Sequence, residues 1–466
     1  MIEIDKIKYV YLIGVGGIGM SALARYFKAY NKDVYGYDKT RTSLTDELVK
    51  EGVHIIYKDD EKELPDFLVA KPIEENILII YTPAIPDNNI IKNYFSTSGY
   101  NLYKRSEVLG MITEGSYTIA VAGTHGKTTT SCMIAHILKS SGRPCTAFMG
   151  GISSNYDTNI LIDKESQDST MVIEADEYDR SFLQLTPDIA VVTSIDADHL
   201  EIYGNHESML DNYMLFAGKL KQNGILIYKQ GLPFESSSAT NITYSIEEKA
   251  TIHTTSIRIS DHKYVFDFNH EGAIHKDFVL TWPGRHNVEN ALAAIAVARF
   301  VGVGYDEIKN ALQSFKGVRR RFDYRLKTED LIYIDDYAHH PKELNATISS
   351  VKELYPGRTV LGVFQPHLYS RTRDFASEFA ESLSQLDQVM LLDIYPAREE
   401  PIEGVTSRII LDKISHDLKA MITMDSIVSD LSNSNADIIL TLGAGDIDSV
   451  VEDIEYALSK KNINQI

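Results

Sequence analysis

The sequence predicts an α/β protein with parallel sheets, built from three successive series of strands and helices. Short apolar, β-branched runs alternate with segments of helical periodicity along nearly the whole chain, which is typical of parallel sheets joined by helical crossovers. The length of 466 residues favours two to four domains. No fixed-period repeat and no long low-complexity linker is evident. We therefore expect three domains, over residues 1–107, 108–321 and 322–466.

The first series begins with a strand, a glycine-rich turn and a helix that ends near Tyr30. Its predicted strands are 8–13, 33–37 and 76–81. The second series also opens on a strand and a glycine-rich turn. Its predicted strands are 117–122, 171–173, 189–193 and 224–228.

Residues 240–282 differ from the rest of the second series. Strand-like segments follow one another there with short gaps, which predicts a small antiparallel annex to the second domain. These segments are 257–259, 264–268 and 278–280, and helices are expected after them over 287–300 and 306–315. The third series has predicted strands at 331–334, 359–364, 389–392 and 437–442, with a closing helix from about 447.

The charge balance restricts the class of partner. Lys and Arg total 46 and Asp and Glu total 66, so the formal net charge is −20. This acidity argues against nucleic acid or an anionic membrane surface as the main partner, although a local pocket for a small anion stays open. Only Cys132 and Cys145 are present, no signal peptide is evident, and no apolar run is long enough to span a bilayer. We expect a cytoplasmic protein.

The first glycine-rich turn fits the pattern G-x-G-x-x-G through Gly14, Gly16 and Gly19. It follows a strand and opens a helix, where backbone amides and close approach favour a diphosphate. Asp38 ends the second strand, where a carboxylate that binds a ribose would lie. Taken alone, the pattern predicts a nicotinamide dinucleotide site, and a tight turn without a ligand is the alternative. This turn alone leaves the ligand undetermined.

The second glycine-rich turn carries the Gly-Lys-Thr core of a phosphate-binding loop. Lys127 is expected to reach terminal phosphates and Thr128 to hold Mg²⁺. Val121 stands where the full pattern requires its first glycine, so the loop is a shortened variant. A loop for ATP beside a loop for a diphosphate favours ATP-driven chemistry on a nucleotide-linked substrate over hydride transfer.

Charged clusters follow several of the later strands. Glu174-Ala175-Asp176-Glu177 and Asp196-Ala197-Asp198-His199 come after strands of the second series, where carboxylates and a histidine could hold metal ions. Solvated acidic loops are the alternative. His286 and Asn287 precede an alanine-rich helix, which they could cap, or they could contact adenine or phosphate.

Arginines and further polar clusters follow near the third series. Arg319-Arg320-Arg321 is a tight basic triplet near the expected domain boundary, suited to clamp a transferring phosphate. Residues 335–341 and 365–373 follow strands of the third series, at the edge where open α/β sheets bind ligands. Their aromatic, histidine and arginine side chains could recognise a carboxylate.

Together these motifs resemble the Mur ligase family, the ATP-dependent amino-acid ligases of peptidoglycan precursor synthesis. The resemblance covers the whole chain, and its motifs are specific in combination. They are Gly14 to Ser21, Gly123 to Thr130, Glu174 to Arg180, Ile195 to His199, Gly284 to Asn290, Arg320-Arg321-Phe322, Asp336 to Pro341 and Gln365 to Arg373. The resemblance implies a Rossmann-like N-terminal domain that binds a UDP-sugar rather than NAD, a central ATP-binding domain, and a Rossmann-like C-terminal domain that binds the amino acid.

The resemblance also implies roles for individual residues. The UDP-sugar would contact Gly14, Gly16, Gly17, Gly19, Met20, Ser21 and Asp38. ATP would contact Gly123, Thr124, His125, Gly126, Lys127, Thr128, Thr129, His286, Asn287 and Arg320. Metal ligands would be Thr128, Glu174 and His199, and catalysis would depend on Lys127, His199 and Arg320. The amino acid would contact Tyr337, His339 and Arg371.

The implied substrates are UDP-N-acetylmuramate, L-alanine and ATP, with Mg²⁺ or Mn²⁺ as the cofactor. The implied reaction phosphorylates the lactyl carboxylate, and the amine then attacks the acyl phosphate. Two departures from the family stand out. The stretch Asp211-Asn212-Tyr213 offers no lysine for the carbamylation seen in some relatives, and Leu368 replaces a basic residue after Gln-Pro-His. Glycine or serine as acceptor, the oligomeric state and the extent of domain closure stay open.

Three other interpretations remain at this stage. A murein tripeptide ligase shares the first two loops, but it adds a recovered peptide in place of one amino acid. An NAD-dependent oxidoreductase would explain the first loop and Asp38, but it leaves Lys127 without a role. A nucleotide sensor without catalysis would release no phosphate in response to the other two substrates.

Overall fold

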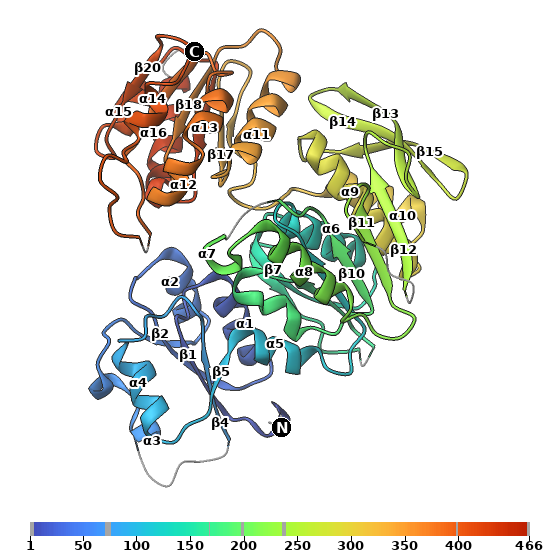
Figure 1. The fold of residues 1–466 in the computed structure, drawn as a ribbon, viewed down its shortest axis with the longest axis vertical. Coiled ribbons are helices and arrows are strands. Elements are labelled where there is room, and N and C mark those ends of the chain that lie inside the picture. Colours follow the sequence, from blue (N-terminus) through green and yellow to red (C-terminus); the bar gives the residue numbers. More distant parts are fainter. Residues whose placement is uncertain are drawn as a thin grey trace. The chain divides into compact units, whose positions relative to one another are not determined.

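The computed structural model describes residues 4–69, 76–166, 168–196, 200–234, 239–397 and 399–463. Their strands form three sheets, and each sheet carries helices on its flanks (Figure 1). The predicted α/β class with parallel sheets is therefore confirmed.

The first sheet is entirely parallel, with the order β3-β2-β1-β4-β5 that places the first strand at its centre. Its strands are β1 Tyr9–Ile13, β2 Asp33–Tyr37, β3 His54–Ile56, β4 Ile77–Tyr81 and β5 Leu102–Lys104. Its helices are α1 Ile18–Ala29, α2 Ser43–Lys50, α3 Asp66–Val69, α4 Ile90–Thr97 and α5 Arg105–Thr113. Strands β3 and β5 were not predicted, because three residues are too few to show an alternating pattern.

Alternation along β1 divides its side chains between two cores. Val10 and Leu12 pack with Phe27 of α1, whereas Tyr11 and Ile13 pack with Phe95 of α4 on the other face. Burying one apolar face under each helical layer fixes the register of the strand. The carboxyl end of β1 therefore meets the start of α1 at the glycine-rich turn.

The second sheet has ten strands in the order β15-β14-β13-β12-β11-β10-β6-β9-β7-β8. Beyond the annex its strands are β6 Thr118–Ala122, β7 Cys145–Ser153, β8 Thr158–Leu161, β9 Thr170–Glu174, β10 Ile189–Val192, β11 Ile225–Lys229 and β12 Thr240–Ser245. They pair in parallel except β8, which is antiparallel to β7. The helices are α6 Lys127–Ser140, α7 Leu200–Tyr203, α8 His206–Ala217, α9 Arg285–Phe300 and α10 Tyr305–Ser314.

The predicted annex consists of β13 Ile252–Ser260, β14 Lys263–His270 and β15 Ala273–Leu280. Two-residue turns join these neighbouring strands, which only antiparallel strands allow. Asp261 and His262 have φ of 50° and 55°, and Glu271 and Gly272 have φ of 54° and 80°. Positive φ at both central residues is the type I′ geometry that matches the twist of a hairpin.

The third sheet has the order β16-β17-β21-β18-β19-β20 and is parallel except for its edge strand β16. Its strands are β16 Asp323–Lys327, β17 Ile332–Asp336, β18 Val360–Phe364, β19 Gln388–Leu391, β20 Lys419–Met421 and β21 Ile438–Leu442. Its helices are α11 Pro341–Leu354, α12 Tyr369–Asp374, α13 Ala376–Leu383, α14 Arg408–Leu411, α15 Ile427–Ser432 and α16 Val451–Ile463.

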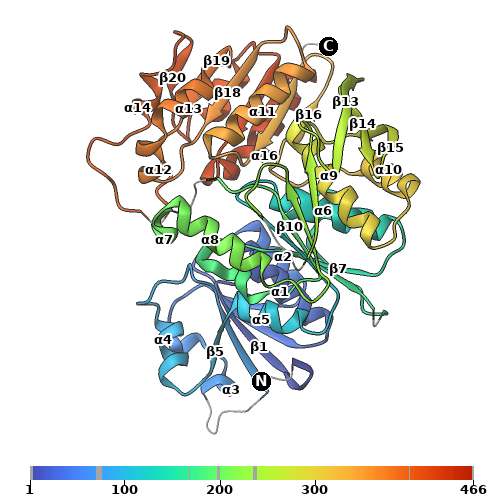
Figure 2. The ribbon, with the colours of Figure 1, turned by 45° about the vertical axis from the view of Figure 1, so that its right-hand side comes forward.

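Helices cover both faces of the third sheet (Figure 2). Leu361 and Val363 of β18 pack with residues of α15 and α16, whereas Phe364 lies 5.2 Å from Phe379 of α13 between ring centroids. Helices α11 and α13 also contact each other. The loops at the carboxyl ends of the strands stay available for polar side chains.

The chain divides into two compact units. The first comprises 1–255, 267–276 and 289–315, and the second comprises 256–266, 277–288 and 316–466. The domain boundaries at 107/108 and 321/322 stay predictions. Within the described residues, no helix is long and apolar enough to cross a membrane.

Within the first unit, α1 connects the first sheet to the second. Tyr26 lies 5.4 Å from Phe148 of β7 between ring centroids. Arg25 donates to Asn159 Oδ1 of β8 at 2.6 Å, and the two residues are nearly fully buried. These contacts hold the turn before α1 next to the second sheet.

Candidate active site

The first glycine-rich turn is shaped by Asp38. The Gly16 amide donates to Asp38 Oδ2 at 2.8 Å, and the Thr40 amide donates to Oδ1 at 3.0 Å. A Cβ on Gly16 would lie 2.8 Å from the same carboxylate oxygen, and Gly14 has φ of +89°. Glycine is therefore required at both positions. Asp38 holds the turn in place, and a contact with a ribose stays a prediction.

Met20 and Ser21 differ in their surroundings. Met20 lines a cavity of about 240 Å³. Ser21 is fully buried, and its hydroxyl donates to Ile18 O at 2.8 Å while accepting from Asn159 Nδ2 at 2.9 Å. Ser21 thus positions the first turn of α1, and a direct contact with the UDP-sugar would require these bonds to break.

The same cavity brings two sequence motifs together. It is lined by residues of the first turn and α1, of α5, of β7, and of the end of β9 with the segment after it, including Gly17, Gly19, Met20, Arg105, Glu174 and Asp176. Arg105 Nη2 lies 3.3 Å from Asp176 Oδ2. Arg105 was not predicted from the sequence. Its signal was a basic pair, Lys104-Arg105, at the carboxyl end of a strand too short to predict.

The second turn is fixed to the segment after β10. The Thr124 amide donates to Ser194 O at 3.0 Å, and the His125 amide donates to Ser194 Oγ at 2.9 Å. Gly123 has φ of +136°, and a Cβ there would collide with Thr193. Gly126 has φ of +81° and directly precedes α6. The turn therefore presents the free amides of the α6 N-terminus as an anion site.

Lys127 lies at the mouth of this turn. Its ammonium donates to Gly123 O at 2.6 Å and to Glu177 Oε1 at 2.8 Å. Burial acts to lower the pKa of Lys127, but the surrounding carboxylates, chiefly Glu177, outweigh burial and raise it. The side chain is therefore a full positive charge at neutral pH, held where a phosphate-binding loop requires one.

Thr128 and Glu174 fit the predicted magnesium site. Thr128 Oγ1 donates to Glu174 Oε1 at 3.0 Å, and Glu174 Oε2 accepts from the Gly150 amide at 2.8 Å. Hydroxyl and carboxylate oxygens are the hard ligands that Mg²⁺ takes beside phosphate and water. The described residues contain no group of three His, Cys, Asp or Glu side chains that could hold a metal without other ligands. His199, the third predicted ligand, lies outside the described residues.

Three further predicted ATP contacts, Thr129, His286 and Asn287, lie at the starts of helices. Thr129 is 7% exposed in the first turn of α6. Asn287 donates to Pro283 O at the start of α9, and His286 lies beside Gly284, whose φ is +113°. Asn290 lies one turn further along α9, and a Cβ added to Gly126 would lie only 2.6 Å from Asn290 Oδ1. Asn290 therefore supports the shape of the phosphate loop.

Arg320 anchors a polar cluster in the second unit. Its guanidinium lies 3.3 Å from Asp335 Oδ2 and 3.1 Å from Asp448 Oδ2, and it donates to Gly443 O at 2.9 Å. Arg320 has φ of 59°, an uncommon conformation that these contacts stabilise. The Tyr337 ring lies 5.0 Å from the Arg320 guanidinium carbon and 5.2 Å from that of Arg321.

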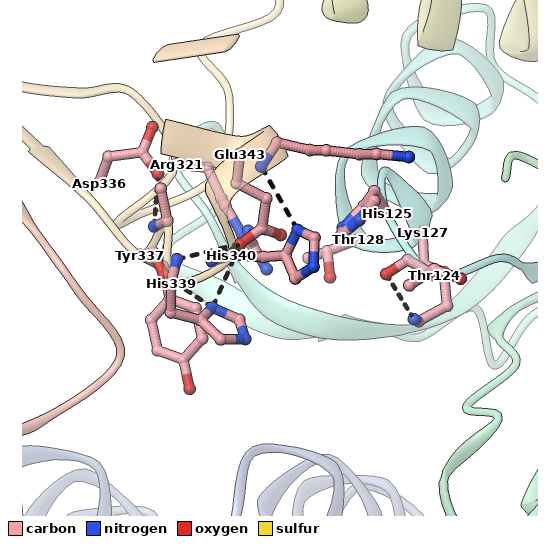
Figure 3. A network of polar contacts seen from close by, with 12 residues as sticks. Thr124, His125, Lys127, Thr128, Arg321, Asp336, Tyr337, His339, His340 and Glu343 are labelled. Carbon is pink, nitrogen blue, oxygen red and sulfur yellow. Dashed lines mark hydrogen bonds and ion pairs between the residues drawn. The ribbon is translucent and has the colours of Figure 1, made fainter. Parts of the chain in front are cut away.

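Asp336 organises the loop after β17 (Figure 3). Its carboxylate accepts from the Phe322 amide at 3.0 Å, the Thr347 hydroxyl at 2.8 Å and the Ala338 amide at 2.8 Å. Burial raises the pKa of Asp336 to about 6, because it outweighs Arg321 and these hydrogen bonds. Asp336 thus holds the segment that carries Tyr337 and His339.

His339 of this loop forms a pair with Glu343, which lies in the first turn of α11 (Figure 3). Glu343 Oε2 accepts from the His339 amide at 3.0 Å and lies 3.3 Å from His339 Nδ1, which is itself 3.0 Å from Tyr337 O. Burial lowers the pKa of His339 to about 4, and Arg371 and Arg321 act in the same direction against Glu343. The imidazole is neutral at pH 7.

The next loop, after β18, supplies further polar groups. Gln365 Nε2 donates to Asp446 Oδ1 at 2.6 Å, and the ring centroid of His367 lies 5.9 Å from that of His339. Arg371 follows in α12 and is 9% exposed. The structure thus brings Tyr337, His339 and Arg371 to the carboxyl edge of the third sheet, as the sequence predicts. Their contact with an amino acid stays a prediction.

Three models of one protein family match successive parts of the chain. "Mur ligase family, catalytic domain" matches residues 9–117, "Mur ligase middle domain" matches 121–298, and "Mur ligase, glutamate ligase domain" matches 320–445. A curated UDP-N-acetylmuramate–L-alanine ligase of Flavobacterium johnsoniae is 48% identical over 458 residues, covering 98% of this chain and 99% of the relative.

Solved structures agree with this relationship. The crystal structure of the UDP-N-acetylmuramate-alanine ligase of Thermotoga maritima is 26% identical and superposes with a TM-score of 0.82, covering 97% of this chain and 99% of that one. A murein peptide ligase of Psychrobacter arcticus shares the fold, with 21% identity, a TM-score of 0.69, and coverage of 97% and 98%.

Proposed function

This chain belongs to the Mur ligase family, and we propose that it joins L-alanine to the lactyl carboxylate of UDP-N-acetylmuramate with ATP as the energy source. The observation that carries the proposal is 48% identity to a UDP-N-acetylmuramate–L-alanine ligase along nearly the whole of both chains. The match along the full length matters, because each of the three substrates would need its own part of the chain.

The UDP-sugar would bind at the first turn. The helix N-terminus supplies amides for its diphosphate, and Arg105 supplies a positive charge in the cavity beside Gly17 and Met20. Glu174 and Asp176 line that cavity too, so the reacting end of the sugar would approach the residues that surround Lys127.

ATP would bind at the second turn. Lys127 would bond oxygens of the terminal phosphates, and Gly126 and the amides of α6 would surround them. Thr128 and Glu174 would hold Mg²⁺, which when bound neutralises charge on the triphosphate. The predicted roles of His199 and Arg320 stay part of the proposal.

The reaction has two steps because a carboxylate is a poor electrophile. A lactyl carboxylate oxygen attacks the γ-phosphorus of ATP, the bond to the bridging oxygen breaks, and ADP leaves. Lys127 stabilises the negative charge on the transferring group. The uncharged amine of alanine then attacks the acyl carbon, and the bond from that carbon to the phosphorylated oxygen breaks. The nitrogen loses one proton, and inorganic phosphate leaves carrying the lactyl oxygen that attacked ATP.

The second step depends on orientation and on excluding water. Tyr337, His339 and Arg371 would hold alanine, with Arg371 facing its carboxylate. Water would hydrolyse the acyl phosphate, so the amine must be in place when the intermediate forms. Because His339 is uncharged, its imidazole can accept a hydrogen bond from the amine of alanine.

A phosphate-release assay tests the proposal. Phosphate should appear only when ATP, UDP-N-acetylmuramate and L-alanine are all present, and a nicotinamide cofactor should have no effect. Glycine and serine measure the strictness for alanine. Turnover with the murein tripeptide but not with L-alanine would favour the murein peptide ligase, and no release with any acceptor would favour a sensor.

A further inference from the structure

Lys127 is paired with a carboxylate that has no role in the proposed function. Glu177 is 1% exposed, and its two carboxylate oxygens lie 2.8 and 2.7 Å from Lys127 Nζ. Gly123 O at 2.6 Å and Thr124 O at 3.4 Å complete the surroundings of the ammonium. An ammonium has three N–H groups, so every one of them has a partner within the protein.

Neighbouring contacts hold Glu177 in this position. Tyr203 donates its hydroxyl to the Glu177 carbonyl at 2.5 Å. Two residues further on, Asp179 and Arg180 have φ of 53° and 55°, and Asp179 is paired with Lys104 at 2.7 Å. The chain thus turns sharply after Glu177 and is held at the Glu177 carbonyl and at Asp179, which directs the carboxylate to Lys127.

A carboxylate at this place conflicts electrostatically with a bound triphosphate. The second turn and the N-terminus of α6 are arranged for an anion, and Glu177 supplies a negative charge at the cation that phosphates need. A phosphate oxygen and the Glu177 carboxylate on one ammonium would repel each other within a few ångströms, where little water screens them. This repulsion favours a shift of Lys127 away from Glu177 when ATP binds.

We propose that Glu177 is a positioning residue that holds Lys127 in the nucleotide-free protein and competes with the terminal phosphates of ATP for its ammonium. The inference rests on the proposed function, because it takes ATP as the ligand of the second turn. It predicts that the carboxylate lowers the affinity for ATP in return for keeping Lys127 in place.

Nucleotide affinity of the full chain tests this competition. The Kd for ATP with Mg²⁺ is measured by calorimetry, without UDP-N-acetylmuramate so that no turnover occurs. Glu177→Gln keeps the shape but removes the charge, and it should bind ATP at least threefold more tightly. Glu177→Asp keeps the charge and should stay within twofold of the wild type. A substitution that damaged the structure of the site would weaken ATP binding, so it could not produce the tighter binding expected of Glu177→Gln.

A matched control separates competition from net charge. Asp188→Asn removes one carboxylate from another ion pair of the same unit, where Asp188 lies 2.7 Å from Lys221. Its Kd for ATP should equal that of the wild type. An equal gain in Asp188→Asn, or an unchanged or weaker affinity in Glu177→Gln, overturns the inference. Wild-type protein that binds no ATP overturns the proposed function itself.

A second measurement needs no variant. A crystal structure of the wild-type protein with an ATP analogue should show Lys127 Nζ bonded to phosphate oxygens and beyond hydrogen-bond distance from both Glu177 oxygens. Retention of the Lys127–Glu177 pair beside the bound phosphates overturns the inference.

Discussion

In the proposed reaction, Lys127 is the residue on which the chemistry most depends. Lys127 provides the positive charge of the second turn. The partial charge of a backbone amide cannot replace this full charge in stabilising the transferring phosphate. Lys127→Ala should lower the rate of phosphate release by about 10³-fold. Binding of UDP-N-acetylmuramate, measured by calorimetry, should change little, because the first turn lies on another sheet. An equal loss of phosphate release and of UDP-N-acetylmuramate binding would contradict the assignment of the two ligands to two different turns.

His339 should make stability depend on pH. Its pKa falls to about 4 in the folded protein, so the native state stays neutral while the unfolded chain takes up a proton below about pH 6.5. The unfolded state then binds more protons than the native state, so the stability falls as the pH is lowered from 6.5 to 4. Lowering the pH from 7 to 5 should therefore reduce the free energy of unfolding by about 2 kcal/mol through His339.

Comparison with His339→Gln isolates this contribution. Asp336 acts in the opposite direction, because its pKa of about 6 lets the native state take up a proton before the unfolded chain does. Urea unfolding at pH 7 and pH 5 should show a larger loss for the wild type than for His339→Gln. Equal losses would mean that the imidazole is charged in the folded protein.

The two ends of α6 offer a matched pair of substitutions at the scale of the element. Gly126 precedes the helix with φ of +81°, and Gly142 follows it with φ of +68°. A side chain at either position costs about 1 kcal/mol of stability through its left-handed backbone. Only at Gly126 would the new Cβ also meet Asn290, at 2.6 Å, whereas Gly142 has open space.

Comparing substitutions at the two glycines therefore separates the cost of backbone strain from the effect of a changed phosphate-binding turn. Gly126→Ala and Gly142→Ala should both lower the melting temperature. Gly126→Ala alone should raise the KM for ATP, about tenfold or more, because the turn must shift to make room. The same KM in both variants would show that Asn290 yields without disturbing the loop.

Strands with a clear apolar pattern were predicted well, whereas the strands that were not predicted comprise short strands, edge strands and the interior strands β7 and β12. The predicted strand at 33–37 coincides with β2, and those at 8–13 and 76–81 begin one residue early. Most residues of these strands are buried, so apolar side chains dominate them. By contrast, β5 and β20 have three residues each, and β16 is an edge strand without a buried core residue.

The site shows the same division between local and long-range information. Turns such as 14–19 and 123–128 are local, so sequence spacing identifies them. The role of Arg105 depends on Asp176, and that of Glu177 on Lys127, and each pair is separated by 50 residues or more. Only the fold brings such residues together, so sequence spacing could not pair them.

At the scale of the whole molecule, the net charge of −20 coexists with sites for anionic substrates. Arg105 and Lys127 are each paired with one carboxylate and Arg320 with two, so their positive charges act locally and are cancelled at a distance. ATP and a UDP-sugar carry their charge on a few oxygens, which amides and single cations can neutralise. A long polyanion would meet the acidic surface as a whole.

Transfer of oxygen from the lactyl carboxylate to phosphate tests the central claim most directly. UDP-N-acetylmuramate labelled with ¹⁸O in that carboxylate is incubated with the protein, ATP and L-alanine, and the products are weighed by mass spectrometry. We expect the alanyl conjugate of UDP-N-acetylmuramate, with one ¹⁸O in each phosphate released. Unlabelled phosphate, or labelled phosphate without the alanyl conjugate, would contradict ligation through an acyl phosphate.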